Sequence, residues 1–269
     1  MPKIVTDDGV QIHYHVDDFR DPWLTEPPET IVMSHGFARS MKWWTQWVPG
    51  LSRKYRVVRY DVRGCGLSSA PGEGAEWSAG RMAADVSNLL DHLGTERAHF
   101  VGFESGGVWG MAFALGYPRR AATLTVINTP LFLGEKRGDR TVSDSVEREG
   151  LKQWLIRTNA QRFDPEITPP ELAEWHLAEH SKTPSRVAAA IMRIVEDADM
   201  TDMLPAIGTP TLIMVGDRAI GRPLASQADM RDRFPDARLA VFPGIGAGIH
   251  LLRVDECVDQ VLRFIDEAG

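Results

Sequence analysis

The chain has 269 residues, 43% of them hydrophobic and 25% charged, a composition that suits one large α/β domain with a buried core. Its net charge of −7 is spread along the chain and argues against nucleic acid or an anionic membrane surface as a partner. The first residues lack the apolar core of a signal peptide, no apolar run is long enough to cross a bilayer, and two cysteines (Cys65, Cys257) cannot build a disulfide framework, so we expect a cytoplasmic protein.

Short apolar runs alternate with helical patterns along most of the chain. The first two runs, residues 3–6 and 10–16, flank Asp7-Asp8-Gly9, which has the residues of a hairpin turn, and the second run is expected at a half-exposed sheet edge. Buried strands are predicted at residues 31–33, 56–60, 98–103, 123–127, 211–215 and 239–242. Helices are predicted at residues 78–93, where Ser78 is the candidate N-cap, at 105–115 and at 258–265.

This alternation predicts an α/β fold with a mostly parallel, twisted sheet of about eight strands and helices on both faces. Residues 131–205 break the pattern, because charged helical stretches replace the strands there, with Pro165, Pro169, Pro170 and Pro184 between them. So long a helical segment between two strands predicts a helical cap inserted into the domain. The expected division is a core of residues 1–130 and 206–269 with a cap of residues 131–205.

The turn Gly102-Phe103-Glu104-Ser105-Gly106 lies where a buried strand runs directly into a helix. Glycines two residues before and after the central position let the backbone pack tightly at such a turn. The central side chain then points up at a helix N-terminus, where backbone N–H groups favour negative charge. The sequence therefore predicts that Glu104 is presented at a functional site.

With these residues, the chain resembles the α/β-hydrolase fold family over nearly its whole length, with glutamate in place of the usual nucleophilic serine. His35-Gly36-Phe37 is similar to the family's oxyanion loop, and the segments 59–68 and 93–102 are similar to its fourth-strand region and its approach to the nucleophile. Several segments look most like enol-lactonases and related ester hydrolases. The resemblance implies an oxyanion hole made by the backbone N–H groups of Phe37 and Ser105.

The resemblance also implies a catalytic histidine and an acid that orients it. His250 is the candidate base, although Ile249 is one residue more than the family's loop contains, which could re-aim the imidazole. Asp217 is the only carboxylate near the expected acid position, and its alternative role is a surface salt bridge with Arg218 or Arg222. His250 could instead be a loop histidine without chemistry.

We expect most of the other histidines and aromatic residues to have structural roles. His13 and His15 are expected on one face of the edge strand, and His176 and His180 on a solvated face of a cap helix. Roles at the pocket stay open for His35, Trp154 and His176. The tryptophans at positions 43, 44 and 47 are expected to pack in the core and against the cap.

A glutamate at the nucleophile position permits three kinds of function. The leading hypothesis is a cofactor-free hydrolase of an ester- or lactone-like bond in a small, partly apolar molecule, with Glu104 as nucleophile or general base and His250 assisting. The second is an epoxide or haloalkane hydrolase that forms a covalent glutamyl ester. It is disfavoured because the cap lacks a tyrosine and Ser105 stands where halide-binding relatives have tryptophan. The third is a non-hydrolytic lyase or a ligand-binding protein with a degenerate triad.

No metal site and no cofactor are expected, since no carboxylate–histidine set has metal-ligand spacing. The expected partner is a small-molecule substrate, and a homodimer is left open. We also expect burial in an apolar pocket to raise the pKa of Glu104.

Overall fold

The computed structural model describes residues 2–131, 140–159 and 162–269, and its centre is an eight-stranded sheet with the strand order β1-β2-β4-β3-β5-β6-β7-β8. Only β1 and β2 run antiparallel to their neighbours, and the other strands are parallel. The strands are β1 (Lys3–Val5), β2 (Gln11–Asp17), β3 (Thr30–Ser34), β4 (Arg56–Tyr60), β5 (Ala98–Phe103), β6 (Ala121–Ile127), β7 (Thr211–Gly216) and β8 (Ala237–Phe242). The predicted α/β fold with a mostly parallel sheet is confirmed.

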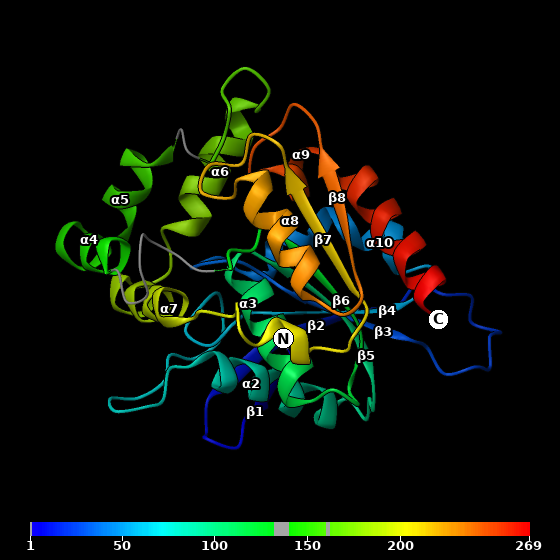
Figure 1. The fold of residues 1–269 in the computed structure, drawn as a ribbon. Coiled ribbons are helices and arrows are strands. Elements are labelled where there is room, and N and C mark those ends of the chain that lie inside the picture. The colour runs from blue at the N-terminus through cyan, green and yellow to red at the C-terminus, as the bar shows by residue number, and fades with distance from the viewer. Residues whose placement is uncertain (1, 132–139, 160–161) are drawn as a thin grey trace.

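Helices cover both faces of this sheet, because the parallel strands are apolar on both sides (Figure 1). Alternate residues of β3 show the division: Ile31 and Met33 belong to one buried cluster, and Val32 belongs to the other. The helices are η1 (Met41–Trp47, 3₁₀), α1 (Val48–Leu51), α2 (Ala79–His92), α3 (Ser105–Gly116), α4 (Thr141–Glu149), α5 (Leu151–Arg157), α6 (Pro170–His180), α7 (Ser185–Asp197), η3 (Leu204–Ala206, 3₁₀), α8 (Leu224–Arg233), α9 (Ile249–Leu252) and α10 (Val254–Ala268).

The N-terminus of α2 shows how local chemistry sets an element boundary. Ser78 is extended, and its hydroxyl oxygen accepts a hydrogen bond from the backbone N–H of Arg81 at 3.0 Å. This bond satisfies one of the amide groups left free at a helix start, so the predicted N-cap is confirmed.

The helices α4 to α7, called here the inserted helices, lie between β6 and β7 in the chain and gather together away from α10 (Figure 1). Their presence agrees with the helical segment predicted from residues 131–205. Residues 132–139 and 160–161 of that segment lie outside the described residues. The division into a core and a cap stays a prediction.

The structure confirms one expectation about the N-terminal strands and contradicts another. The hairpin of β1 and β2 is confirmed, but β2 is not the sheet edge, because β1 pairs with its outer side. His13 is consequently buried, and its Nδ1 lies 2.8 Å from Oδ2 of buried Asp61. Of the two histidines expected on one face of an edge strand, His13 is buried and His15 is exposed.

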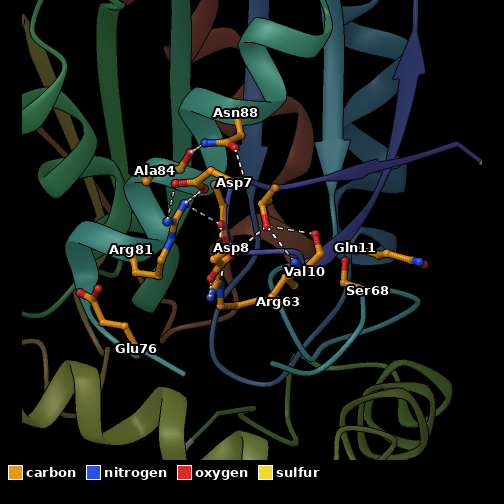
Figure 2. A network of polar contacts seen from close by, with 12 residues as sticks. Asp7, Asp8, Val10, Gln11, Arg63, Ser68, Glu76, Arg81, Ala84 and Asn88 are labelled. Carbon is orange, nitrogen blue, oxygen red and sulfur yellow. Dashed lines mark hydrogen bonds and ion pairs between the residues drawn. The ribbon is translucent and has the colours of Figure 1, made fainter. Parts of the chain in front are cut away.

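A polar network centred on the buried Arg63 joins this hairpin to α2 (Figure 2). The guanidinium of Arg63 is fully buried and donates through Nε to Asp85 on α2 at 2.7 Å and through Nη1 to Asp8 of the hairpin turn at 2.8 Å. Arg81 of α2 donates to Asp7 at 2.7 Å. These carboxylates offset the cost of burying the Arg63 guanidinium, so that Arg63 can join the hairpin turn to α2.

No helix in the described part of the chain is long and apolar enough to span a membrane.

Candidate active site

Three non-glycine residues in the left-handed backbone region mark the ends of neighbouring parallel strands. Ala38 follows β3 with φ of 51°, Glu104 follows β5 with φ of 48°, and Asn128 follows β6 with φ of 47°. Such conformations cost energy and persist where the surrounding structure enforces them, which is common at functional sites. The carboxyl ends of β3, β5 and β6 are therefore the first candidate for the site.

The turn at Glu104 has the sharp geometry that its glycines predict. A Cβ on Gly102 would overlap the backbone carbonyl of Gly106, and one on Gly107 would overlap the side chain of Thr129. Glu104 has φ of 48° and ψ of −115° and directly precedes α3. The close approach of strand and helix at this turn is possible only because these positions lack side chains.

The carboxylate of Glu104 is held by Arg39, which sequence reasoning did not single out. Arg39 donates to Oε2 through Nη1 in a short contact and to Oε1 through Nη2 at 3.5 Å. The Arg39 side chain is 3% exposed and the Glu104 side chain 20% exposed, so the pair is largely shielded from water.

This ion pair reverses the expected direction of the pKa of Glu104. Burial raises the pKa, as expected, but the charge and hydrogen bonds of Arg39, with smaller contributions from Arg222 and Arg162, lower it below its ordinary value. The expectation of a raised pKa is wrong, since it considered an apolar pocket and not its arginines. Glu104 is a carboxylate at neutral pH.

The side chain of Glu104 also lies against the predicted oxyanion loop. Its Oε2 would be 2.9 Å from a Cβ placed on Gly36. The backbone N–H groups of Phe37 and Ser105 donate no hydrogen bond to any other described residue. Two free amides thus flank the carboxylate, as an oxyanion hole requires, and their role stays a prediction.

His250 lies in the short helix α9, and the extra residue Ile249 is fully buried in the core at the start of this helix. The imidazole stacks on Phe103 with a centroid distance of 3.6 Å and an interplanar angle of 27°. Trp47 Nε1 donates to the backbone oxygen of His250 at 2.8 Å. These contacts fix the ring beside the strand that ends at Glu104.

The imidazole of His250 is neutral and is only weakly engaged by the backbone, through Ala247. Burial lowers the pKa of His250 well below its ordinary value, and the charge of Arg39 lowers it further, while the nearby Ala247 backbone partly opposes both. Neither ring nitrogen makes a hydrogen bond of standard geometry with a described residue. His250 can therefore accept or donate a proton toward a small molecule bound beside it.

Two cavities meet at Glu104. The larger has a volume of about 240 Å³ and includes Phe37, Arg39, Ser105 and Asn128 in its lining. The smaller has a volume of about 10 Å³ and is lined by Arg39, Phe103, Glu104, Arg162, Phe163, His176, Ala247, Gly248 and His250. The smaller cavity is about the size of one water molecule. A bound water there would contact the carboxylate and the imidazole.

Asp217 is placed away from this centre. Its side chain is exposed, and Oδ1 accepts a hydrogen bond from the backbone N–H of Gly244 at 2.8 Å. Within the described residues it bonds to neither His250 nor Arg218 nor Arg222. The structure does not bring the predicted acid and base together, and this contact favours a loop-stabilising role for Asp217.

Of the three remaining pocket candidates, two line a cavity and the third supports the oxyanion loop. Trp154 lines the larger cavity, and His176 lines the smaller one with Nε2 3.5 Å from Arg39 Nη2. His35 lines neither cavity, because both of its ring nitrogens bond to backbone, Nδ1 to the Gly36 carbonyl at 2.8 Å and Nε2 to the Val62 amide at 2.9 Å. His35 therefore shapes the oxyanion loop, which corrects its assignment to the pocket.

The histidines of α6 are buried, so the expectation of a solvated helix face is wrong. His176 is 2% exposed and His180 is fully buried, and their rings meet edge to face at 5.0 Å. Burial lowers the pKa of His176 to about 2, with Arg39 adding to the effect. The tryptophans behave as predicted: Trp43 packs on Trp175 of α6 at 4.6 Å, while those at positions 44 and 47 lie in the core.

Sequence reasoning missed the polar residues that complete the site. Arg39, Arg162 and Arg222 all face Glu104, and Asn128 Nδ2 donates to the Ala247 carbonyl at 2.8 Å, which fastens the loop before His250. Arg39 lies two residues after the His35-Gly36-Phe37 motif, so its position in the sequence could have indicated a place at the site. Arg162 and Arg222 lie in loops without a motif. Within the described residues, no cluster of histidine, cysteine, aspartate or glutamate could hold a metal ion.

Comparisons with known proteins agree with this fold. The family model described as alpha/beta hydrolase fold matches residues 29–167. The chain is 29% identical to 3-oxoadipate enol-lactonase 1 of Acinetobacter baylyi over 193 residues, which cover 71% of each chain. It is 26% identical to a non-heme haloperoxidase of Rhodococcus erythropolis over 284 residues, which cover 99% of this chain and 100% of the haloperoxidase. The crystal structure of the enol-lactonase from Burkholderia xenovorans superposes with a TM-score of 0.89 at 23% identity, covering 98% of this chain and 100% of that chain. This likeness to a solved structure concerns the fold.

Proposed function

The chain belongs to the α/β-hydrolase fold family, and from this premise we propose that it hydrolyses an ester- or lactone-like bond in a small, partly apolar molecule. One observation carries the proposal: the ionised carboxylate of Glu104 and the neutral imidazole of His250 line the same water-sized cavity. The residues of the predicted oxyanion hole, Phe37 and Ser105, line the larger cavity, and Glu104 lines both cavities. Names of relatives, such as the enol-lactonase of Acinetobacter baylyi, support the same class of reaction.

In this mechanism the carbonyl oxygen of the substrate binds to the N–H groups of Phe37 and Ser105. A water in the small cavity attacks the carbonyl carbon, and Glu104 accepts a proton from that water. His250 holds the water through a ring nitrogen. The bond between the carbonyl carbon and the leaving oxygen then breaks, and the proton on Glu104 passes to the leaving oxygen. The products are a carboxylic acid and an alcohol or enol.

Chemistry favours this water route over direct attack by Glu104 on an ester. Direct attack would give an intermediate that can expel either a carboxylate or an alkoxide. A carboxylate is a far weaker base and leaves more readily, so this intermediate would return to the starting ester. The ion pair with Arg39 also restrains the carboxylate from advancing on a substrate carbon.

The test is hydrolysis of short-chain p-nitrophenyl esters and γ-lactones by the intact protein and by Glu104→Gln. Loss of the general base should lower kcat by about 10²–10⁴-fold. Ser105→Ala is the matched control on the same turn, and it should keep kcat within about threefold, because it retains the backbone amide. Full activity of Glu104→Gln, or loss of activity in Ser105→Ala alone, would overturn the assignment in favour of a serine enzyme.

A single turnover in ¹⁸O water separates the water route from the covalent route. On the water route the label enters the product acid and the peptide that contains Glu104 stays unlabelled. A covalent glutamyl ester, as in the epoxide or haloalkane alternative, would leave ¹⁸O in Glu104 after its hydrolysis. Binding of candidate substrates without turnover by any variant would instead support the ligand-binding alternative.

A further inference from the structure

The larger cavity carries an excess of positive charge. Among the described residues, the charged side chains that line it are Arg39, Arg162 and Arg222 and a single carboxylate, Glu104. Glu104 is paired with Arg39, so two guanidinium groups at the cavity are left without a carboxylate partner among the described residues. Placing a cation away from water is costly unless it is paired, so such an arrangement indicates an anionic ligand.

Arg222 reaches the cavity from the loop between β7 and α8. Its Nε donates to the backbone oxygen of Asn128 at 3.0 Å, and its Nη1 donates to the backbone oxygen of Gly221 at 2.7 Å. Both acceptors are neutral, so they orient the guanidinium without neutralising it. No hydrogen bond from Nη2 to a described residue is found, which leaves a donor for a ligand.

Arg162 reaches the same cavity from the loop between α5 and α6. Its Nη1 donates to the backbone oxygen of Thr158 at 2.8 Å and to the Thr158 hydroxyl at 2.7 Å. Its guanidinium carbon lies 4.5 Å from the ring centroid of Trp154, in a cation–π contact that fixes the plane of the group. Burial lowers the pKa of Arg162 to about 10, and the neighbouring charge of Arg39 adds to this effect. Arg162 remains charged at neutral pH.

Most of the remaining side chains that line the cavity are apolar. Side chains from the inserted helices and from the loop after β7 supply most of this apolar lining: Val142, Trp154, Met192, Val195 and Ile220. A volume of about 240 Å³ suits a molecule of a few carbon atoms. Guanidinium groups are well suited to carboxylates, which they bind through parallel hydrogen bonds.

We propose that Arg162 and Arg222 bind a free carboxylate of the substrate, so that the preferred substrate is an ester or lactone that also carries a carboxylate. This proposal rests on the proposed function, and it adds the substrate class. The carboxylate is held at the arginines, while the reacting carbonyl lies beside Glu104. Each end of the substrate then has its own polar site, and the apolar lining contacts the chain between them.

The first experiment compares two substrates of the same shape, monomethyl glutarate and the methyl ester of its monoamide. The protein should hydrolyse the charged substrate with a kcat/KM about 10- to 100-fold higher, as expected for one or two charge-assisted hydrogen bonds. Arg162→Gln and Arg222→Gln should each lower the ratio of kcat/KM for the carboxylate substrate to kcat/KM for the amide substrate about 10-fold, mainly through the KM of the carboxylate substrate.

Arg218→Gln is the matched control, because Arg218 is an exposed arginine four residues from Arg222 that lines neither cavity. It should leave the preference for the carboxylate substrate unchanged. Equal hydrolysis of both substrates would overturn the carboxylate proposal and leave the proposed hydrolase function intact. Equal loss for both substrates in Arg162→Gln and Arg222→Gln would also overturn it, since that result indicates a purely structural role.

The second experiment measures binding without turnover. Calorimetric titration with glutarate, glutaramide and inorganic phosphate should show glutarate binding alone, with about 10-fold weaker affinity in Arg222→Gln. Equal binding of phosphate would overturn the proposal, since the site would then accept any small anion. If glutarate binds but no ester or lactone is hydrolysed, the carboxylate site stands and the proposed function fails.

Discussion

Removing the guanidinium of Arg39 tests the electrostatic account of the site most directly. Arg39→Gln keeps a polar but shorter side chain and takes the positive charge away from Glu104. In the native protein burial raises the pKa of Glu104 and the charge of Arg39 outweighs that effect. In the variant burial is opposed only by Arg222 and Arg162, so the pKa of Glu104 should move up.

The magnitude follows from the geometry of the pair. Two unit charges about 4 Å apart attract by about 4 kcal/mol at the effective dielectric constant of about 20 that suits protein sites. Breaking a buried pair by removing one partner costs about 3–5 kcal/mol because the other charge is left uncompensated. Glu104 is 20% exposed, so water can replace part of the lost interaction. We therefore expect a stability loss of about 2 kcal/mol at pH ~7.

The sign of the pH dependence is fixed by the lowered pKa. A carboxyl group whose pKa is lower in the folded state stabilises the fold above its unfolded pKa, and this contribution is lost as the pH falls through the folded value. The ordinary pKa of Glu104 is 4.5. The difference in stability between the native protein and Arg39→Gln should therefore be largest at neutral pH and become smaller as the pH falls below that pKa.

Urea unfolding at pH ~7 and pH ~3 measures this difference, and the acid limb of kcat/KM reports the same carboxylate during catalysis. The acid limb should move to higher pH in Arg39→Gln. Arg39→Lys, which keeps the charge, should move it less. An unchanged acid limb, together with a stability loss that is equal at both pH values, would refute the reasoning, because the role of Arg39 would then be packing alone.

Three further predictions concern the surroundings of the site. Asp217→Asn should keep kcat within about twofold, since this carboxylate is exposed and bonds to a loop amide, whereas a loss above about 10-fold in steady-state assays would identify it as the acid that orients His250. Gly102→Ala should lower stability by at least about 2 kcal/mol in thermal unfolding, because the new Cβ overlaps backbone, while Gly208→Ala, with open space around it, should change little. Arg63→Gln should cost about 3 kcal/mol in urea unfolding, because buried Asp85 keeps only its 3.4 Å contact with Arg81, and a cost below about 1 kcal/mol would contradict the structural role of that network.

The polypeptide's local patterns predicted most of the elements near the site. The strand that ends at Phe103, the glycine-flanked turn at Glu104 and the following helix all lie where apolar runs and glycines place them. These features depend on neighbours in the chain, since strand burial, a left-handed turn and a helix start are each determined within a few residues. The short helix at Ile249 was not predicted, because four residues give no periodic pattern.

The role of single polar residues was predicted less well. His176 and His180 share one face of a helix, and spacing alone could not tell whether that face meets solvent or Trp43 and Phe37. Asp217 lies near the expected position in sequence, yet its side chain turns to the Gly244 amide. A shift of one residue in a loop decides such a contact, and no periodicity governs loops.

The sequence alone determined the α/β class of the fold and the presence of a carboxylate at the turn above the sheet, because both follow from short-range patterns of apolar residues and glycines. Only the tertiary structure decided the electrostatic character of the site. Arg39, Arg162 and Arg222 are far apart in the chain and converge on Glu104 in space. Coulomb interactions depend on spatial distance and burial, so the lowered pKa of that carboxylate follows from the fold and not from the order of residues.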